Sequence, residues 1–350
     1  MNLQQLLLSG RAQNASDIHL IVGLPPIFRI HGDIVTSKGD TITPEQVKKL
    51  AYEKLNAYQI ETLEKTFQLC FSIHSKETDR ARVTIYFRNG NPELSIRLTE
   101  KNIRTRQELR LPEVIDDLAR KQNGLVVISG PTGTGKTTTF NYMLDLINTE
   151  RYCKIITIED PIEYTHTAKR SIVVQQEVLT DVADFQGALK HVLRQDPDVI
   201  GVGEMRDRET IYTTLIAAET GHLVIATLHT PNTIALVQRI VSVFSEGQQS
   251  EIRQILASCL QGVIAQQLLP HISGKSLLLN TEILIATTAV RAHIRDNDLH
   301  LIYSEMQTGS KHKMVTFDRS LLELYQKAEI TYDTAINMAL HPNSIKERMA

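Results

Sequence analysis

One segment of the chain limits its possible folds more than any other, the run Gly130-Pro-Thr-Gly-Thr-Gly-Lys136-Thr137. It follows the apolar residues 125–129 and precedes a helical pattern from about residue 137 to residue 148, which is the strand, loop and helix context of a phosphate-binding P-loop. Its glycines let consecutive backbone N–H groups turn toward phosphate oxygens, and the following helix adds the positive end of its dipole. A glycine-rich turn that matches by chance is the alternative, and the flanking strand and helix argue against it.

The side chains of this loop have distinct expected roles. Lys136 is expected to reach the β- and γ-phosphate oxygens of ATP, and the Thr137 hydroxyl is expected to bind Mg²⁺. ATP and Mg²⁺ are therefore the expected cofactors. The predicted cofactor-binding residues are Gly130, Pro131, Thr132, Gly133, Thr134, Gly135, Lys136, Thr137 and Thr138.

A P-loop needs a second acidic site for the metal ion and the attacking water. The segment Asp198-Val-Ile-Gly-Val-Gly-Glu204 is an apolar strand that ends in a carboxylate, as a Walker B strand does. Gly203 stands where the metal-holding acid usually precedes the glutamate, so we expect Glu204 to act alone on Mg²⁺, through a metal-bound water. The alternative is that Glu204 caps the next helix.

Two further polar segments follow predicted strands. Ile158-Glu-Asp-Pro-Ile-Glu-Tyr164 carries three carboxylates, one of which could orient or deprotonate water, although acidic loops are usually only solvated. His222 and His229 flank one apolar strand. A lone histidine is most often a structural residue, but two at the ends of one strand beside a P-loop favour a sensor of the γ-phosphate.

Length and composition indicate a soluble globular chain of two domains. Its 350 residues exceed the roughly 100 to 200 of one domain, and 42% apolar with 22% charged residues exclude a disordered chain. The 38 basic and 40 acidic residues give no drive toward nucleic acid, so no direct nucleic-acid partner is expected. The three cysteines form no CxxC pair. Neither a signal peptide nor an apolar run of about 18 residues is found, so a cytoplasmic location is expected.

The pattern of elements predicts an α/β protein with a small α+β domain at residues 1–98, a linker at 99–111 and a second domain at 112–350. In the first domain Thr43 and Gln46 form a capping box that opens a helix toward Leu55. In the second, strands alternate with helices, as in a parallel sheet that holds its ligand at the carboxyl ends of the strands. Pro112 is expected to open a helix, and the chain from residue 247 onward to be mostly helical, with one apolar face. That face comprises Ile252, Ile255, Leu256, Val263 and Ile264. Strands are expected at residues 17–21, 26–30, 69–73, 81–87, 94–98, 125–129, 154–158, 198–202 and 222–227.

Together the motifs resemble the Walker A, Asp box, Walker B and His box of the type II/IV secretion ATPase superfamily. They occupy residues 130–137, 157–164, 196–206 and 220–230. This resemblance implies a hexameric motor in which a PAS-like N-terminal domain precedes a RecA-like ATPase domain. Over its whole length the chain is most similar to the twitching-motility retraction ATPases of type IV pili. The stretch Ala289-Val-Arg-Ala-His-Ile-Arg-Asp296 resembles one that this family needs for retraction, and departs from it at Ala292 and His293.

The resemblance also implies residue roles. Glu163 would be the catalytic carboxylate of the Asp box, Glu204 the Walker B acid and His229 a γ-phosphate contact. Arg82 and Arg97 match family arginines that approach the nucleotide from a neighbouring position in the ring.

The implied function is a Mg-ATP-hydrolysing motor for pilus retraction. It would be a homo-hexamer that docks on an inner-membrane pilus platform protein, peripherally associated with the membrane complex at the cytoplasmic face of the bacterial inner membrane. One alternative is an ATPase that energises secretion or conjugation of protein or DNA. Another is a catalytically silent regulatory subunit.

Overall fold

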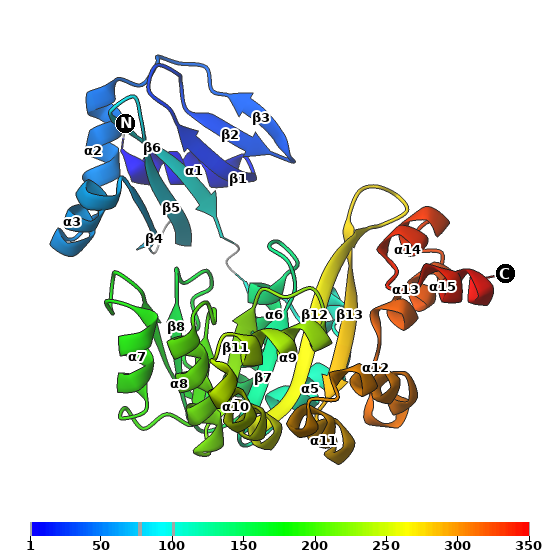
Figure 1. The fold of residues 1–350 in the computed structure, drawn as a ribbon. Coiled ribbons are helices and arrows are strands. Elements are labelled where there is room, and N and C mark those ends of the chain that lie inside the picture. The colour runs from blue at the N-terminus through cyan, green and yellow to red at the C-terminus, as the bar shows by residue number, and fades with distance from the viewer. Residues whose placement is uncertain (1, 76–78, 100–101, 350) are drawn as a thin grey trace. The chain divides into compact units, whose positions relative to one another are not determined.

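The computed structural model describes residues 2–75, 79–99 and 102–349 (Figure 1). Glu100 and Lys101 of the predicted linker lie outside the described residues. Among those described, no helix combines the length and the apolar character needed to cross a bilayer.

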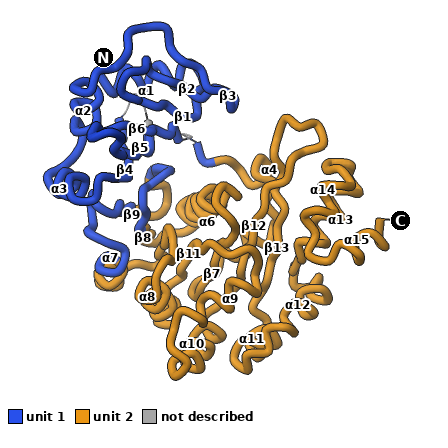
Figure 2. Tube along the Cα trace, turned by 45° about the horizontal axis from the view of Figure 1, so that its top comes forward, with its two compact units in different colours: residues 1–103, 158–167, 175–188 blue, residues 104–157, 168–174, 189–350 orange. Residues whose placement is uncertain are grey.

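The chain divides into two compact units (Figure 2). The first comprises Met1–Ile103, Ile158–Thr167 and Gln175–Ala188, and the second Arg104–Thr157, Ala168–Val174 and Leu189–Ala350. The backbone therefore passes from one unit to the other five times. Two segments of the second predicted domain, Ile158–Thr167 and Gln175–Ala188, belong to the first unit. The domain boundaries predicted from the sequence stay a prediction.

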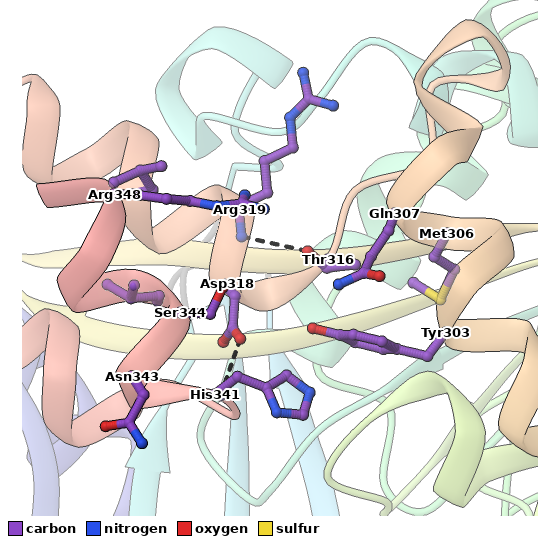
Figure 3. Close-up of a pocket in the computed structure, with 12 residues that line it drawn as sticks. Tyr303, Met306, Gln307, Thr316, Asp318, Arg319, His341, Asn343, Ser344 and Arg348 are labelled. Atoms are coloured by element: carbon purple, nitrogen blue, oxygen red, sulfur yellow. Dashed lines mark hydrogen bonds between the residues drawn. The ribbon is translucent and has the colours of Figure 1, made fainter.

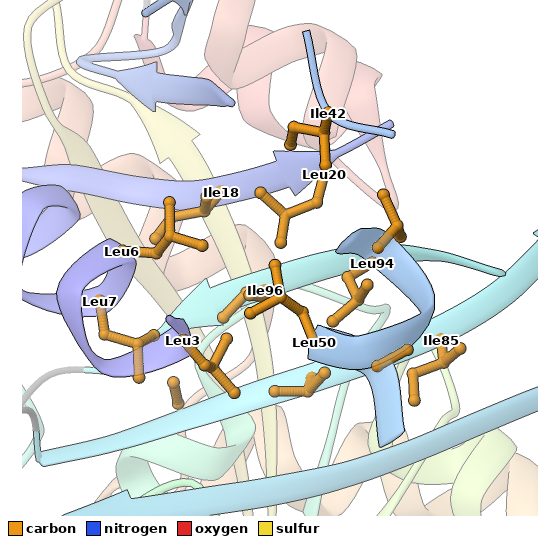
Figure 4. Close-up of a cluster of buried hydrophobic side chains, with 14 of the residues drawn as sticks. Leu3, Leu6, Leu7, Ile18, Leu20, Ile42, Leu50, Ile85, Leu94 and Ile96 are labelled. Carbon is orange, nitrogen blue, oxygen red and sulfur yellow. The ribbon is translucent and has the colours of Figure 1, made fainter. Parts of the chain in front are cut away.

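The first unit is built on a six-stranded antiparallel sheet in the order β3-β2-β1-β6-β5-β4. Successive side chains of a strand point to opposite faces, so the alternating residues Ile18, Leu20, Leu94 and Ile96 form one buried face. Figure 4 shows this face with the leucines of the first helix. The strands are β1 (Ala15–Leu20), β2 (Ile27–Ile30), β3 (Asp33–Thr36), β4 (Gln68–Ser75), β5 (Asp79–Arg88) and β6 (Asn91–Leu98), and the helices are α1 (Leu3–Ala12), α2 (Pro44–Tyr52) and α3 (Ala57–Thr66).

The capping box predicted at the start of α2 is confirmed. Thr43 Oγ1 accepts the Gln46 N–H at 3.3 Å, and Gln46 Oε1 accepts the Thr43 N–H at 2.9 Å. Two orphan donors of the first turn are satisfied in this way. The helix ends at Tyr52, three residues before Leu55.

The second sheet has seven strands in the order β13-β12-β7-β11-β10-β8-β9. Strands β10, β11, β7 and β12 run parallel, and β13 is an antiparallel edge strand. Strands β7, β10 and β11 are buried along their whole length, as expected for a parallel sheet covered by helices. The strands are β7 (Gly124–Ser129), β8 (Lys154–Glu159), β9 (Ile172–Glu177), β10 (Val199–Val202), β11 (Leu223–Leu228), β12 (Leu260–Pro270) and β13 (Leu277–Ile285).

Helices of the second unit pack on this sheet, with α6 and α8 both against β7 and β11. The predicted opening of a helix at Pro112 is displaced by two residues, because α5 begins at Val114. The helices up to the last strands are α4 (Arg106–Leu109), α5 (Val114–Ala119), α6 (Lys136–Glu150), α7 (Phe185–Val192), α8 (Arg208–Glu219), α9 (Thr233–Ser242) and α10 (Glu246–Cys259).

The prediction that residues from 247 onward are mostly helical is wrong for the stretch after α10. Val263 and Ile264 lie in β12, which pairs with β7 and with β13. Their spacing continues the apolar face of α10, but both faces of β12 are buried, so its apolar residues run on without the alternation that marks a half-exposed strand. Beyond β13 the chain is helical, with α11 (Thr288–Asp296), α12 (Leu299–Thr308), α13 (Phe317–Gln326), α14 (Tyr332–Met338) and α15 (Pro342–Met349).

Candidate functional site

Strand register places three of the predicted motifs at one edge of the second sheet. Leu228 of β11 pairs with Ser129 of β7, and Val202 of β10 pairs with Ala226 of β11. The residues that follow these strands are the P-loop, His229 and Glu204. They therefore meet at the carboxyl ends of adjacent parallel strands, where open α/β sheets hold their ligands.

The P-loop glycines are required by its backbone. Gly130, Gly133 and Gly135 have φ angles of +144°, +81° and +87°, which glycine adopts most readily. A Cβ at Gly130 would also lie 2.5 Å from the carbonyl oxygen of Gln266 on β12. Gly135 caps α6 without a side-chain hydrogen bond, so the first N–H groups of the helix remain available to an anion.

Lys136 is held at this edge by three acceptors. Its ammonium donates to the carbonyl oxygens of Gly130 and Pro131, each at 2.8 Å, and lies 3.3 Å from His229 Nδ1. Burial lowers the pKa of Lys136 from its ordinary value, and the negative charge of Glu204 opposes this shift. The ammonium thus lies within the loop whose amides would bind phosphate.

A line of polar contacts continues from Lys136 through His229 to Glu204. His229 Nε2 lies 3.3 Å from Glu204 Oε1, and Arg206 Nε donates to Glu204 Oε2 at 2.8 Å. Because an ammonium can only donate, we assign the lone pair of His229 to Nδ1 and the proton to Nε2, on the side of the Glu204 carboxylate. Burial, the Lys136 ammonium and Arg206 lower the pKa of His229, whereas Glu204 opposes them, so the ring is neutral at neutral pH.

The capping alternative for Glu204 is excluded. Asp207 is the N-cap of α8, and its carboxylate accepts the Thr210 N–H at 2.9 Å. His222, by contrast, has a structural role, since its Nδ1 lies 2.9 Å from the carbonyl oxygen of Ala217 at the end of α8. Of the two histidines, only His229 is placed beside Lys136.

Thr137 and Glu204 have the oxygens that magnesium prefers. Glu204 Oε2 accepts one hydrogen bond, from Arg206, and Oε1 lies 3.3 Å from His229 Nε2. Thr137 lies half-buried in the first turn of α6. Mg²⁺ usually keeps several waters and takes one or two protein oxygens together with substrate phosphates. The described part of the chain holds no group of three or more His, Cys, Asp or Glu side chains arranged for a metal.

The remaining predicted residues lie in the first unit. Arg82 on β5 pairs through Nη1 with Glu163 Oε1 at 3.2 Å, and both side chains are about 30% exposed. Arg97 on β6 lies beside Arg82 in the register and donates from Nε to Asp17 at 3.0 Å. The structure thus brings Arg82 and Glu163 into direct contact, while Arg97 is bound by an aspartate that sequence reasoning missed.

Sequence reasoning also missed the residues that support the loop of Glu163. Gln175 on β9 donates to the carbonyl oxygen of Tyr164 at 2.9 Å and to Glu159 at 3.1 Å, and it accepts the His166 N–H at 2.8 Å. The available signal was the polar pair Gln175 and Glu177, two residues apart on a short strand, which places both on one face.

A hollow of about 540 Å³ lies elsewhere in the second unit, between α12, α13 and α15 (Figure 3). Asp318 closes one side by accepting the N–H groups of Leu340 and His341 at 2.8 and 3.0 Å. Burial raises the pKa of Tyr303, which contacts the His341 ring edge to face, to about 12. None of the motif residues lines this hollow, so it is separate from the candidate site.

The sheet, the loop between β7 and α6 and the residues after β10 and β11 define the second unit as a RecA-like P-loop fold. A family model for "Type II/IV secretion system protein" matches residues 73–335, so the chain belongs to this family. The Pseudomonas aeruginosa "Type IV pilus retractation ATPase PilT" is 39% identical over 344 residues, covering 98% of this chain and 100% of the relative. The "Twitching motility protein" of Neisseria gonorrhoeae is 36% identical over 344 residues, covering 98% and 92%.

Solved structures confirm the fold class. A crystal structure of the pilus retraction motor PilT with bound ADP matches with a TM-score of 0.91 and 40% identity, covering 99% of each chain. The Legionella pneumophila ATPase DotB shares the fold, with a TM-score of 0.85 and 24% identity over 95% of this chain and 93% of that one. The predicted α/β class, with a RecA-like unit and a smaller N-terminal α+β unit, is therefore correct.

The pKa of His229 gives a first testable prediction. Because its pKa lies below the ordinary 6.5, an NMR titration of the imidazole should show a midpoint under that value. The unfolded chain then binds this proton at a higher pH than the folded chain, so stability falls as the pH drops below 6.5. Removing the neighbouring cation in Lys136→Ala should raise the midpoint, and Glu204→Gln should lower it. A midpoint at or above 6.5 in the unsubstituted protein would contradict the assigned neutral ring.

Proposed function

We propose that the chain is a Mg-ATP-hydrolysing motor that powers retraction of a type IV pilus. The proposal rests on the line of polar contacts from Lys136 through His229 to Glu204 at one edge of the sheet. This line joins a phosphate-binding cation to a carboxylate through a neutral histidine. Similarity to retraction ATPases over the whole length supports the choice of task.

In the proposed reaction a water oxygen adds to the γ-phosphorus of ATP, the bond from that phosphorus to the bridging oxygen breaks, and ADP, phosphate and a proton result. Lys136 exchanges the carbonyls of Gly130 and Pro131 for phosphate oxygens, where it offsets the developing negative charge. His229 keeps its proton on Nε2 and turns this N–H from Glu204 to a γ-phosphate oxygen. Thr137, and Glu204 through a water, would hold Mg²⁺, which would supply further charge compensation.

The first unit is proposed to contribute Glu163, which orients the attacking water, and the arginines Arg82 and Arg97. An arginine aimed at a developing phosphoryl charge can raise the rate about 10³-fold or more. The proposed working form is a homo-hexamer, docked on an inner-membrane pilus platform protein at the cytoplasmic face of the membrane.

Deleting the gene tests the proposed task. The mutant is expected to carry more surface pili than the parent and to lose twitching, and a plasmid copy of the unsubstituted gene should restore both. A Lys136→Ala copy should not. Normal twitching with an unchanged pilus count would refute a role in retraction.

A secretion or conjugation ATPase is the second candidate. It is favoured by α11, where Ala292 and His293 depart from the retraction stretch and His293 Nε2 lies 3.8 Å from Glu305 on α12. Loss of a secreted protein or of DNA transfer in the deletion strain, with pili unaffected, would support this alternative.

A further inference from the structure

Glu177, the last residue of β9, is a buried carboxylate that the proposed reaction does not use. Its side chain is only 2% exposed. It lies in the first unit, as do all of its hydrogen-bond partners described below.

The Glu177 carboxylate binds residues of β4 and β5. It accepts the Ser72 N–H at 2.8 Å and the Ser72 hydroxyl, and Arg80 Nη1 donates to it at 2.9 Å. Arg80 Nη1 also donates to Ser72 Oγ at 2.6 Å. The carboxylate is thereby bonded to two neighbouring strands of the N-terminal sheet.

The same carboxylate binds the loop of Glu163 and the turn that follows β9. It accepts the Ile162 N–H at 3.1 Å and the Thr180 hydroxyl at 3.1 Å. A carboxylate has about four lone-pair sites, and burying it is costly unless they are filled. Glu177 fills them with donors from separate segments, so those segments are fixed relative to one another.

These hydrogen bonds connect Glu177 to Glu163 by two routes, one through Ile162 and one through β5. Ile162 precedes Glu163, whose carboxylate pairs with Arg82. Arg82 lies two residues after Arg80 on β5 and therefore on the same face of the sheet. Glu177 thus holds both the loop that carries Glu163 and the strand that carries its arginine partner.

We propose that Glu177 is a positioning residue, which fixes the Glu163 loop on β4 and β5 so that the carboxylate of Glu163 and the guanidinium of Arg82 keep one geometry. This inference rests on the proposed catalytic role of Glu163. It assigns Glu177 no contact with nucleotide or water.

The test is steady-state ATP hydrolysis by the full chain carrying Glu177→Gln. The isosteric amide replaces one acceptor oxygen with a donor. At the position of Oε2 this donor opposes the Ile162 N–H and the Arg80 guanidinium, and at that of Oε1 it opposes the Ser72 N–H. We expect kcat to fall about 10- to 100-fold, the loss typical of a misplaced catalytic group, with KM for ATP unchanged because the P-loop is untouched. Faster amide hydrogen exchange in residues 160–164 should accompany the loss.

Glu93→Gln is the matched control. Glu93 is also buried in the first unit and pairs with an arginine of β5, Arg88, at 2.7 Å. It also bonds Tyr86 of the same strand, so these contacts lie within the sheet. Glu93→Gln should lower thermal stability about as much as Glu177→Gln does. It should leave kcat and amide hydrogen exchange in the Glu163 loop unchanged. An equal loss of kcat in both variants would mean a general structural effect and would overturn the proposal.

A double substitution separates this inference from the role of Glu163. If Glu177 acts through Glu163, adding Glu177→Gln to Glu163→Gln should reduce kcat little further, because coupled residues are not additive. A lowered kcat in Glu163→Gln with a normal kcat in Glu177→Gln overturns the positioning role alone. A normal kcat in Glu163→Gln overturns the proposed function of Glu163 instead. Should Glu177→Gln not fold, Ser72→Ala removes one donor to Glu177 and one acceptor of Arg80. We expect it to lower kcat about threefold or more at constant KM, in keeping with the loss of these two hydrogen bonds. An unchanged kcat would overturn the proposal.

Discussion

Replacing Lys136 with alanine is expected to lower ATP turnover about 100-fold or more, while the protein stays folded and assembles to the same size. The ammonium lies among the carbonyls of the P-loop, from which it can transfer to phosphate oxygens. Alanine removes this charge without a change in the glycines that shape the loop. Phosphate release, circular dichroism and light scattering measure the three expected results.

Nucleotide binding gives a second measure of the same substitution. ATP stabilises a protein that binds it only in the folded state, by an amount that grows with its concentration over the dissociation constant. The thermal shift with ATP should therefore be large in the unsubstituted chain and small in Lys136→Ala. Lys169→Ala, which removes an exposed lysine paired with Asp145 in the same unit, should retain both turnover and shift. Retained turnover in Lys136→Ala would refute the assignment of the site.

Replacing Glu204 with glutamine is expected to leave ATP binding nearly unchanged and to lower kcat about 100-fold or more, the size of a lost electrostatic contribution to the transition state. The amide keeps the volume of the side chain but loses the charge that holds metal-bound water. It also loses an acceptor for His229 Nε2 or Arg206. Binding of labelled ATP and single-turnover hydrolysis separate these effects.

The control for this substitution is Glu209→Gln. Glu209 is an exposed glutamate in the first turn of α8, five residues after Glu204. The Glu209→Gln variant should hydrolyse ATP at the normal rate. An unchanged rate in Glu204→Gln would remove Glu204 from the mechanism and leave Glu163 as the carboxylate to test.

The sequence predicted best those features of the fold that depend only on residues close together in the chain. The capping box at Thr43 depends on residues three apart, and it forms as expected. The β12 and β13 hairpin could not be predicted in this way, because α10 and β12 share one apolar run and the change at Leu260 is set by pairing with Leu125. Strand β3 and helix α3 were also missed. All residues of β3 are exposed, so it has no buried face to produce an alternating pattern.

In the candidate site, too, some contacts could be predicted from the sequence and others could not. Lys136, Glu204 and His229 follow apolar strands, and parallel strands bring such residues to one edge, so their proximity was predictable. The contacts of Glu177 were not, because Ser72 and Arg80 lie 105 and 97 positions away in the sequence. Only the folded chain brings these residues together.

The five passages of the backbone between the two units have a mechanical consequence. Two of them flank residues 158–167, the segment that includes Glu163. Any rotation of one unit against the other therefore twists the backbone near residues 157, 167, 174 and 188, as well as at residues 103 and 104. Torque between the units would therefore act directly on the peptide segment that bears Glu163.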